Sequence, residues 1–155
     1  MAARTENEVV INASLDLVWD MTNDVQSWPT LYTEYAKAEI LERAGDTVRF
    51  RLTTHVQADG TVWSWVSERT ADAAARTVRA RRIETGPLLE SMAIFWDYTE
   101  TPTGVRMRWV QEFQLRPTAP VGEAEAVAFL DRETKIQMAH IKEVVEAAAV
   151  GSAVG

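Results

Sequence analysis

The side chains best suited to chemistry alternate along one strand-like segment, residues 61–70. One face of this segment presents two indole rings followed by two polar groups: Trp63, Trp65, Ser67 and Arg69. A guanidinium stays protonated in proteins, so Arg69 can donate hydrogen bonds to an oxygen that gains negative charge but cannot remove a proton. Ser67 can hold a water molecule or a hydroxyl group beside it. The segment therefore predicts a site that stabilises an oxyanion.

Neighbouring segments mix aromatic rings and polar groups in the same way. Their otherwise apolar faces carry Arg82 within 76–84, Met92 and Trp96 within 91–99, and Trp109 and Gln111 within 104–115. Burying an unpaired charge costs several kcal/mol and burying an unpartnered amide roughly 1–3 kcal/mol, so a solid core does not suit this mixture. Each residue alone has a plainer explanation, since an arginine can extend its head group to solvent and a tryptophan pair can fill a core. Their combination favours an interior pocket with aromatic walls, to which two short helices would add Trp28, Tyr32 and Tyr35.

Other kinds of site lack their usual signals. Ser67 has no nucleophile-elbow sequence around it. The two histidines, His55 and His140, are far apart and have neither metal-binding nor triad spacing. The chain has no cysteine and no glycine-rich phosphate loop. We therefore expect neither a metal nor a cofactor.

The composition describes one globular domain. The 155 residues are 46% hydrophobic and 25% charged, and the net charge is −7. An acidic chain does not suit nucleic-acid binding, which needs a basic surface. No apolar run approaches the ~20 residues that span a bilayer, and residues 1–8 have no apolar signal core. We expect a cytoplasmic protein without a membrane partner, and a monomer.

The expected elements are one strand, two short helices, six strands and one long helix. Alternation indicates strands over 8–12, 38–42, 47–54, 61–70, 76–84, 91–99 and 104–115, with turn signals between them. Short helices are expected after Ser14 and over 25–32, and an apolar stripe predicts a long helix over 123–149. Short connections make neighbouring strands antiparallel. The result is an α+β fold in which a curved seven-stranded antiparallel sheet surrounds the C-terminal helix, with one domain over 1–149 and a flexible tail over 150–155.

Three stretches carry a resemblance to a known family: Val62-Trp63-Ser64-Trp65-Val66-Ser67-Glu68-Arg69, Arg82-Ile83-Glu84-Thr85-Gly86-Pro87 and Met107-Arg108-Trp109-Val110-Gln111-Glu112-Phe113. With Leu17-Val18-Trp19-Asp20 and Trp28-Pro29, they closely resemble the single-domain aromatase/cyclases of bacterial type II polyketide synthases, of the tetracenomycin and spore-pigment types. The resemblance extends to about Val145. It implies a helix-grip (START/Bet v 1-like) fold around an interior pocket. The matching pocket positions are Trp28, Tyr35, Trp63, Trp65, Ser67, Arg69, Arg82, Trp96 and Gln111.

The resemblance also implies a reaction and partners. A poly-β-ketone, tethered to an acyl carrier protein by phosphopantetheine, would undergo regiospecific aldol closure of its first ring and then dehydration to an aromatic ring, beside other subunits of the synthase. Arg69 would stabilise the enolate or alkoxide, Ser67 would hold a water or hydroxyl, and Tyr35 would donate a proton. Carrier proteins are generally acidic, so Arg49 with Arg51, or Arg79 with Arg81, would form a docking patch.

Two alternatives stay open. The same fold can serve as a non-catalytic carrier of a lipid, a quinone or a polyketide, because fold does not fix function. A third reading is an interaction subunit that organises the synthase, for which pocket substitutions would be silent. The pairing of Ser67 and Arg69 inside an aromatic wall favours catalysis.

Overall fold

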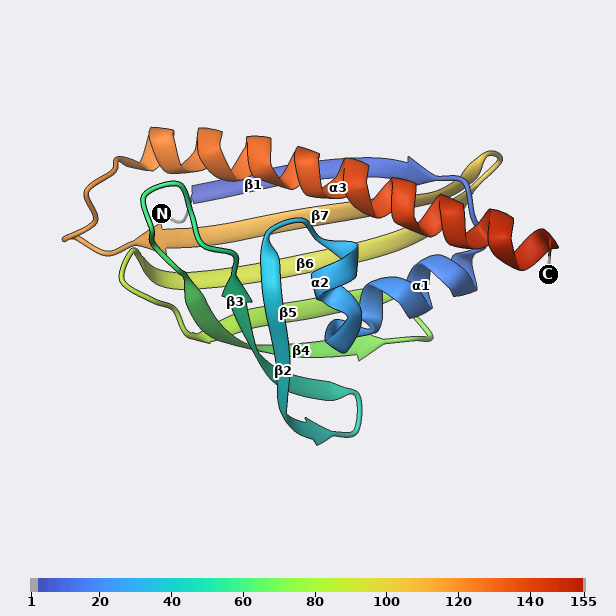
Figure 1. Ribbon diagram of the computed structural model, residues 1–155, viewed down its shortest axis with the longest axis horizontal. Helices are drawn as coiled ribbons and strands as arrows, with labels where there is room; N and C mark the ends of the chain where they lie inside the picture. Colours follow the sequence, from blue (N-terminus) through green and yellow to red (C-terminus); the bar gives the residue numbers. More distant parts are fainter. Residues whose placement is uncertain (1–2, 155) are drawn as a thin grey trace.

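One strand, two short helices, six further strands and a long helix follow one another in the predicted order (Figure 1). The computed structural model describes residues 3–154, and the side chains of 3–151. The elements are β1 (Ala3–Ile11), α1 (Leu15–Asn23), the single 3₁₀ turn η1 (Val25–Ser27), α2 (Trp28–Leu31), β2 (Tyr35–Ala44), β3 (Thr47–Thr54), β4 (Ser64–Asp72), β5 (Thr77–Glu84), β6 (Leu89–Thr101), β7 (Gly104–Leu115) and α3 (Glu123–Val154). Within this range, none of the helices combines the length and apolar character needed to cross a lipid bilayer.

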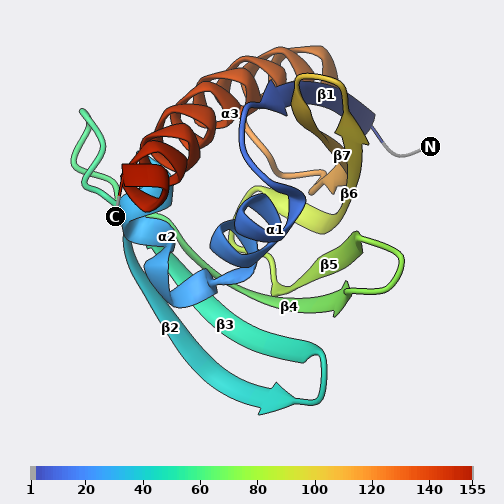
Figure 2. The same ribbon diagram turned by 90° about the vertical axis from the view of Figure 1, so that its right-hand side faces the viewer.

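The seven strands form one antiparallel sheet in the order β1-β7-β6-β5-β4-β3-β2. Strands adjacent in sequence are therefore neighbours, except that β1 pairs with β7 from Ala3 opposite Phe113 to Ile11 opposite Val105. Figure 2 shows the sheet curling, with α3 lying along the opening between its two edges and α1 and α2 on the inner side. The predicted α+β fold, with its curved sheet and long terminal helix, is confirmed.

A capping hydrogen bond marks the start of α1, and burial of apolar side chains orients α3. Ser14 caps α1, since its side chain accepts a hydrogen bond from the Leu17 N–H at 3.2 Å. The predicted apolar stripe of α3 faces the sheet, where Ile141 and Val145 are fully buried. Helix α3 continues to Val154, five residues beyond its predicted end at 149. The flexibility predicted for the tail is not tested, and the side chains of 152–155 lie outside the described ones.

Two strand boundaries differ from the prediction in ways that affect the site. Strand β1 begins at Ala3 and not at residue 8, because the inward Thr5 and Asn7 find polar partners and need not be apolar. Strand β4 begins at Ser64, so Trp63 precedes the strand and is only partly buried. The aromatic wall therefore starts at Trp65, two residues later than the alternation suggested.

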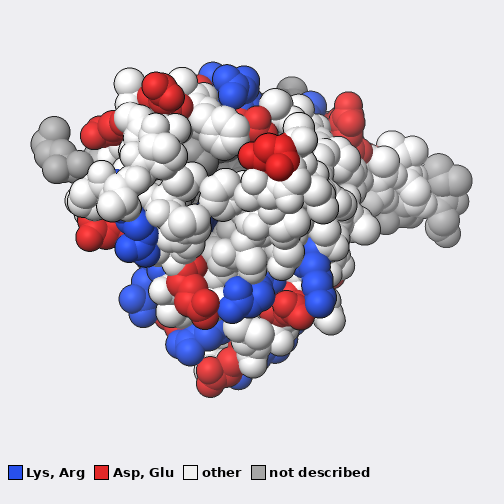
Figure 3. All heavy atoms as spheres, turned by 60° about the vertical axis from the view of Figure 1, so that its left-hand side comes forward, with Lys and Arg blue, Asp and Glu red and all other residues white. Residues whose placement is uncertain are grey.

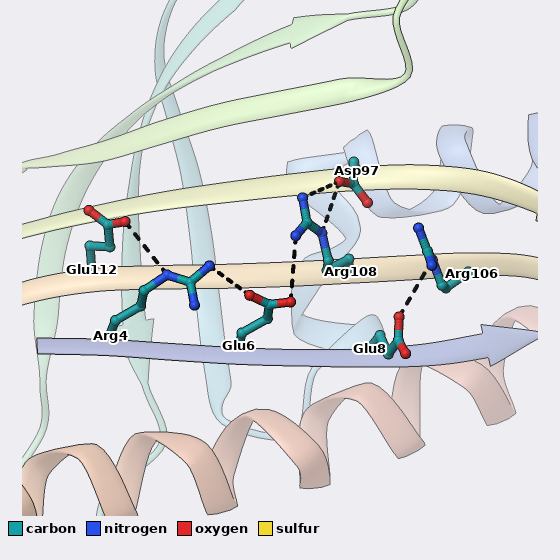
Figure 4. Close-up of polar contacts among 7 residues, drawn as sticks. All are labelled: Arg4, Glu6, Glu8, Asp97, Arg106, Arg108 and Glu112. Carbon is teal, nitrogen blue, oxygen red and sulfur yellow. Dashed lines mark hydrogen bonds and ion pairs between the residues drawn. The ribbon is translucent and has the colours of Figure 1, made fainter.

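An ion-pair network covers the outer face of β1, β7 and β6 (Figure 4). Arg108 donates to Asp97 Oδ2 from Nη2 at 2.6 Å and from Nε at 2.9 Å. Its Nη1 reaches Glu6 at 3.5 Å, and Glu6 also accepts from Arg4 at 2.6 Å. The hydrogen bond from Arg4 lowers the pKa of Glu6. The network joins the edge strand β1 to the centre of the sheet.

Substituting Asp97→Asn removes the carboxylate that accepts both bonds from Arg108. We expect a loss of about 1 kcal/mol in the free energy of unfolding, because Asp97 Oδ2 accepts two bonds from Arg108 but the pair is partly exposed. The loss should shrink as salt is added, since salt screens exposed charges. Urea unfolding at two salt concentrations measures it. Glu100→Gln, on an exposed position of the same strand and outside the described ion pairs, is the matched control; equal losses in both variants would show that the network adds nothing specific.

Candidate functional site

Arg69 is buried on the inner face of the sheet, with 3% of its surface exposed. Its Nη2 donates to Asn23 Oδ1 at 2.9 Å and to the Thr22 carbonyl at 3.3 Å, both at the end of α1. The guanidinium carbon lies 4.3 Å from the ring centre of Trp96 and 5.1 Å from that of Trp28. These contacts fix the cation between two indoles and stabilise its charge in an apolar place.

Tyr98 extends this arrangement on the side of α1. Its hydroxyl lies 2.7 Å from Thr22 Oγ1, which itself donates to the Val18 carbonyl at 2.7 Å. Because the Thr22 proton is used there, the Tyr98 hydroxyl is the donor in their shared bond. Burial lowers the pKa of Arg69, while the neighbouring Tyr98 and Tyr32 have the opposite effect. Arg69 is thus held by α1, β6 and the aromatic rings together.

A second cation, Arg82, lies along the sheet on β5. Its guanidinium carbon sits 4.0 Å from the ring centre of Trp65. Burial lowers the pKa of Arg82 to about 10, and the nearby Tyr35 and Glu34 partly offset this. Ser67 lies directly opposite Arg82 across the β4–β5 ladder. Arg82 therefore remains a cation at neutral pH, close to Tyr35 and Glu34.

Buried polar groups without partners mark this interior. Among the described side chains, three N–H donors from predicted site residues are buried and lack a hydrogen-bond partner: Arg69 Nη1, Arg82 Nε and Trp109 Nε1. Leaving a buried donor unsatisfied costs roughly 1–3 kcal/mol each. Such a set is expected where a bound molecule brings acceptors. The donors come from β4, β5 and β7, so an acceptor-rich ligand would lie across the inner face of the sheet.

The aromatic rings pack closely against one another. Ring centres lie 5.0 Å apart for Trp28 and Tyr32, 5.0 Å for Tyr32 and Tyr35, and 5.5 Å for Trp96 and Trp109. A surface hollow of about 370 Å³ lies instead in an outer groove of the sheet that includes Phe95. The interior pocket stays a prediction.

Most residues predicted for the site do meet in this interior. Trp28, Tyr32, Tyr35, Trp96 and Trp109 belong to one buried cluster, with Trp65 against it. Met92 does not, because it lies near the start of β6 and packs with Leu89 and Phe113 in a second cluster. Gln111 is already satisfied, since its Oε1 accepts from Thr5 at 2.9 Å and from Thr134 at 3.0 Å. Its amide joins β1 to α3, a structural contact.

Four residues close to the site were not predicted. Thr22 and Asn23 hold Arg69 from a point 46 or more residues away in the chain, a distance that no local pattern reveals. Tyr98 lies on the face of β6 that the alternation identified as bulky, and that position was the available signal. Glu34, next to Tyr35 in sequence, has a pKa raised by burial, which Tyr35 and Arg82 partly counter.

Comparison with known proteins identifies similar chains. The family model described as "Polyketide cyclase / dehydrase and lipid transport" matches residues 2–146. A putative polyketide cyclase of Streptomyces cyaneus is 55% identical over 146 residues, which cover 94% of this chain and 95% of the relative. A putative polyketide cyclase of Streptomyces halstedii is 66% identical over 110 residues, covering 71% of this chain and 100% of the relative.

Solved structures share the fold. The Zhui aromatase/cyclase from Streptomyces sp. R1128 superposes with a TM-score of 0.79 at 24% identity, over 96% of this chain and 94% of that one. At this level of sequence identity, the comparison shows that the two proteins share a fold. It supports the helix-grip arrangement that the curved sheet and α3 display.

Proposed function

Because the chain belongs to the polyketide cyclase/dehydrase and lipid transport family, we propose that it is an aromatase/cyclase acting on a carrier-bound poly-β-ketone. It closes the first ring by an intramolecular aldol reaction and dehydrates that ring to an aromatic one. The reaction takes place in the cytoplasm, beside the other subunits of a type II synthase.

The unpartnered donors carry this proposal. A poly-β-ketone has a carbonyl oxygen on every second carbon, and each oxygen accepts hydrogen bonds. Arg69 Nη1, Arg82 Nε and Trp109 Nε1 offer buried N–H groups that lack acceptors. A polyketide that lies over the rings would accept hydrogen bonds from all three donors. These bonds would fix which of its carbons approach one another. Lipid tails have no such acceptors, so the non-catalytic lipid carrier is the weaker candidate.

Arg69 has the geometry of an oxyanion site. Its free Nη1 lies in an apolar cage, where a donor stabilises developing negative charge more than it would in water. The two indoles and the contact with Asn23 hold the guanidinium in place, so little reorganisation is needed during the reaction. Ser67 and Arg82, opposite one another on β4 and β5, provide a second polar position for a ketone or hydroxyl further along the chain.

Docking of an acyl carrier protein needs a surface that its acidic side chains can use. The predicted arginine pairs are largely occupied: Arg49 contacts Glu68 at 3.0 Å, Arg81 contacts Glu68 at 3.6 Å, and Arg51 contacts Glu84 at 3.3 Å. Figure 3 shows basic and acidic side chains interleaved over the lower part of one face, below a middle region with few charges. Docking through these arginines would therefore exchange internal ion pairs for partner contacts and would weaken with salt.

Reconstitution of a minimal type II synthase with and without the protein tests the function. Adding the protein should divert shunt products into one regiospecifically cyclised aromatic product. Mass spectrometry measures the change in the product profile. An unchanged product profile with chains of several lengths would reject the cyclase and favour the carrier.

Trp109→Phe isolates one of the three donors. The substitution keeps an aromatic ring and removes Nε1–H, but the smaller ring also leaves a cavity beside Trp96 and Tyr32. We expect the ratio of directed to spontaneous product to fall by roughly 5–10-fold, the value of one hydrogen bond of about 1 kcal/mol. Thermal stability should fall only slightly, since the loss of an unsatisfied buried donor offsets part of the cost of the cavity. A fall in stability with an unchanged product ratio would assign Trp109 to packing alone.

A further inference from the structure

The acceptors that hold Arg69 carry no charge. On the outer face of the sheet, Arg108 pairs with the Asp97 carboxylate at 2.6 Å. Arg69 instead donates to the side-chain amide of Asn23 and to the backbone carbonyl of Thr22. It takes part in none of the ion pairs among the described side chains. A buried cation without a counter-charge costs stability, so this choice of partner has to be explained.

The Asn23 amide holds one edge of the guanidinium. Its Oδ1 accepts from Arg69 Nη2 at 2.9 Å and from Arg69 Nε at 3.3 Å. The same Nη2 also donates to the Thr22 carbonyl at 3.3 Å. Of the three guanidinium nitrogens, Nη1 is the one that is left without a partner. The contact with Asn23 therefore determines which N–H groups of Arg69 remain available to a ligand.

The Asn23 side chain is itself fixed in direction. Its Nδ2 donates to the Trp19 carbonyl, one turn earlier in α1, at 2.8 Å. This bond engages the nitrogen of the amide and leaves the oxygen directed at the guanidinium. Helix α1 lies on the inner side of the sheet (Figure 2). Asp16 ties it to Arg76 at 2.7 Å, and the Trp19 ring packs edge-on against Tyr98 with 5.1 Å between ring centres. The amide thus has a fixed position relative to the strands.

The end of α1 stabilises the guanidinium without neutralising it. Thr22 and Asn23 are the last two residues of this helix. The final carbonyl groups of a helix carry a partial negative charge, so a cation beside them is stabilised. A carboxylate at position 23 would stabilise the cation more strongly but would also cancel its charge. A guanidinium without a counter-charge attracts an enolate or alkoxide more strongly than one that is already paired.

Resting on the proposed function, we propose that Asn23 is a positioning residue with two effects, both exerted through Arg69. It presents Nη1 of Arg69 to the oxygen that gains negative charge. Because its amide is neutral, it also leaves the charge of the guanidinium available to that oxygen. The loss of stability that comes with an unpaired cation is thus part of the site. Asn23→Asp, which keeps an acceptor but adds a counter-charge, should preserve stability and impair product steering.

Two small aromatic probes test the availability of the cation at equilibrium. 2-Naphthoate and 2-naphthol share a bicyclic ring, but only 2-naphthoate is an anion at neutral pH. Calorimetry measures the affinity of the full chain for each. In Asn23→Asp, we expect the affinity for 2-naphthoate to fall at least about 10-fold and that for 2-naphthol to change by less than about two-fold, because only the anion bonds to the charged donor. This readout does not depend on the cyclase reaction.

Stability and product steering should separate in the same variant. The urea midpoint of Asn23→Asp should equal or exceed that of the wild type, because a bond between charged groups outweighs the lost bond to the Trp19 carbonyl. The ratio of directed to spontaneous product should fall by about 10–100-fold, since the oxyanion would compete with a carboxylate for Arg69.

Asn23→Ala isolates the effect on orientation. The charge of Arg69 stays, but its Nε loses its acceptor and the guanidinium gains freedom to turn. We expect the product ratio to fall by about 5–10-fold and the urea midpoint to decrease. An unchanged product ratio in a folded Asn23→Ala variant would show that Asn23 does not position Arg69.

Gln26→Glu is the matched control for added negative charge. Gln26 lies in η1, three residues after Asn23, and its side chain is exposed. The substitution places the same charge near the end of α1 without contact to Arg69. Probe affinities, urea midpoint and product ratio should all stay at their wild-type values. A loss equal to that of Asn23→Asp would attribute the effect to the general field of the surface and would overturn the proposal.

The remaining outcomes separate the positioning role from the cyclase function. A wild-type protein that does not redirect products rejects the cyclase, whereas a selective loss of 2-naphthoate in Asn23→Asp would still support the neutral contact. A wild-type protein that does not bind 2-naphthoate overturns the proposal. So does an Asn23→Asp variant that binds this anion and steers products as well as the wild type. Loss of both probes together with stability in Asn23→Asp would assign Asn23 a structural role alone.

Discussion

Arg69→Met should abolish most of the product steering while leaving the protein folded. We expect the ratio of directed to spontaneous product to fall by about 10²–10³-fold, the usual loss when an oxyanion donor is removed from a water-excluded site. Methionine is unbranched and polarisable, so it can fill the space between Trp28 and Trp96. The substitution also removes an unsatisfied buried donor, which offsets part of the lost contact with Asn23.

Arg132→Met provides the control for loss of a positive charge. Arg132 is exposed on α3, with its guanidinium carbon 5.6 Å from the ring centre of Phe129. It should leave the product ratio unchanged. Mass spectrometry of the reconstituted reaction and circular dichroism of each variant give the two readouts. If a folded Arg69→Met variant kept the wild-type product ratio, the interior would only bind the polyketide. The carrier alternative would then be preferred.

The two faces of each strand were predictable because a strand alternates with a period of two. Trp96 and Tyr98 on β6, and Met107 and Trp109 on β7, are all buried as expected. The same rule places Ser67 and Arg69 on the inner face of β4. Period alone does not say where along a long strand the site ends. Met92 shares the face of Trp96, yet it lies four residues nearer the start of β6 and contacts a different cluster.

The supports of the site could not be predicted, because they depend on contacts distant in sequence. Asn23 reaches Arg69 only because α1 lies on the inner side of the curved sheet. Tyr35 was expected in the site as a proton donor, and its neighbours at the start of β2 include Glu34 and Arg82. Gln111 had the right type and the right face for a ligand contact. The register of β1 instead brings Thr5 opposite it and satisfies its oxygen.

The second large effect concerns Gly104, at the turn between β6 and β7. Gly104 has φ +149°, a backbone conformation that other residues rarely adopt. A Cβ at this position would overlap the Ile11 carbonyl oxygen and lie 2.8 Å from the Ile11 carbonyl carbon and 3.0 Å from Asn12 Cα. All three are backbone atoms of the end of β1, which cannot move aside as a flexible side chain could. Any side chain here must push β1 away from β7.

Gly104→Ala should therefore destabilise the fold by about 3–5 kcal/mol, combining overpacking with backbone strain. Gly122→Ala, where a Cβ would meet open space, should change stability by no more than about 0.5 kcal/mol. Urea unfolding compares the two. The site should suffer as well, because the displaced segment leads directly into α1, whose last residues hold Arg69. A Gly104→Ala variant with wild-type stability would show that the end of β1 is free to shift, and its product ratio would then reveal whether α1 must stay fixed for Arg69 to work.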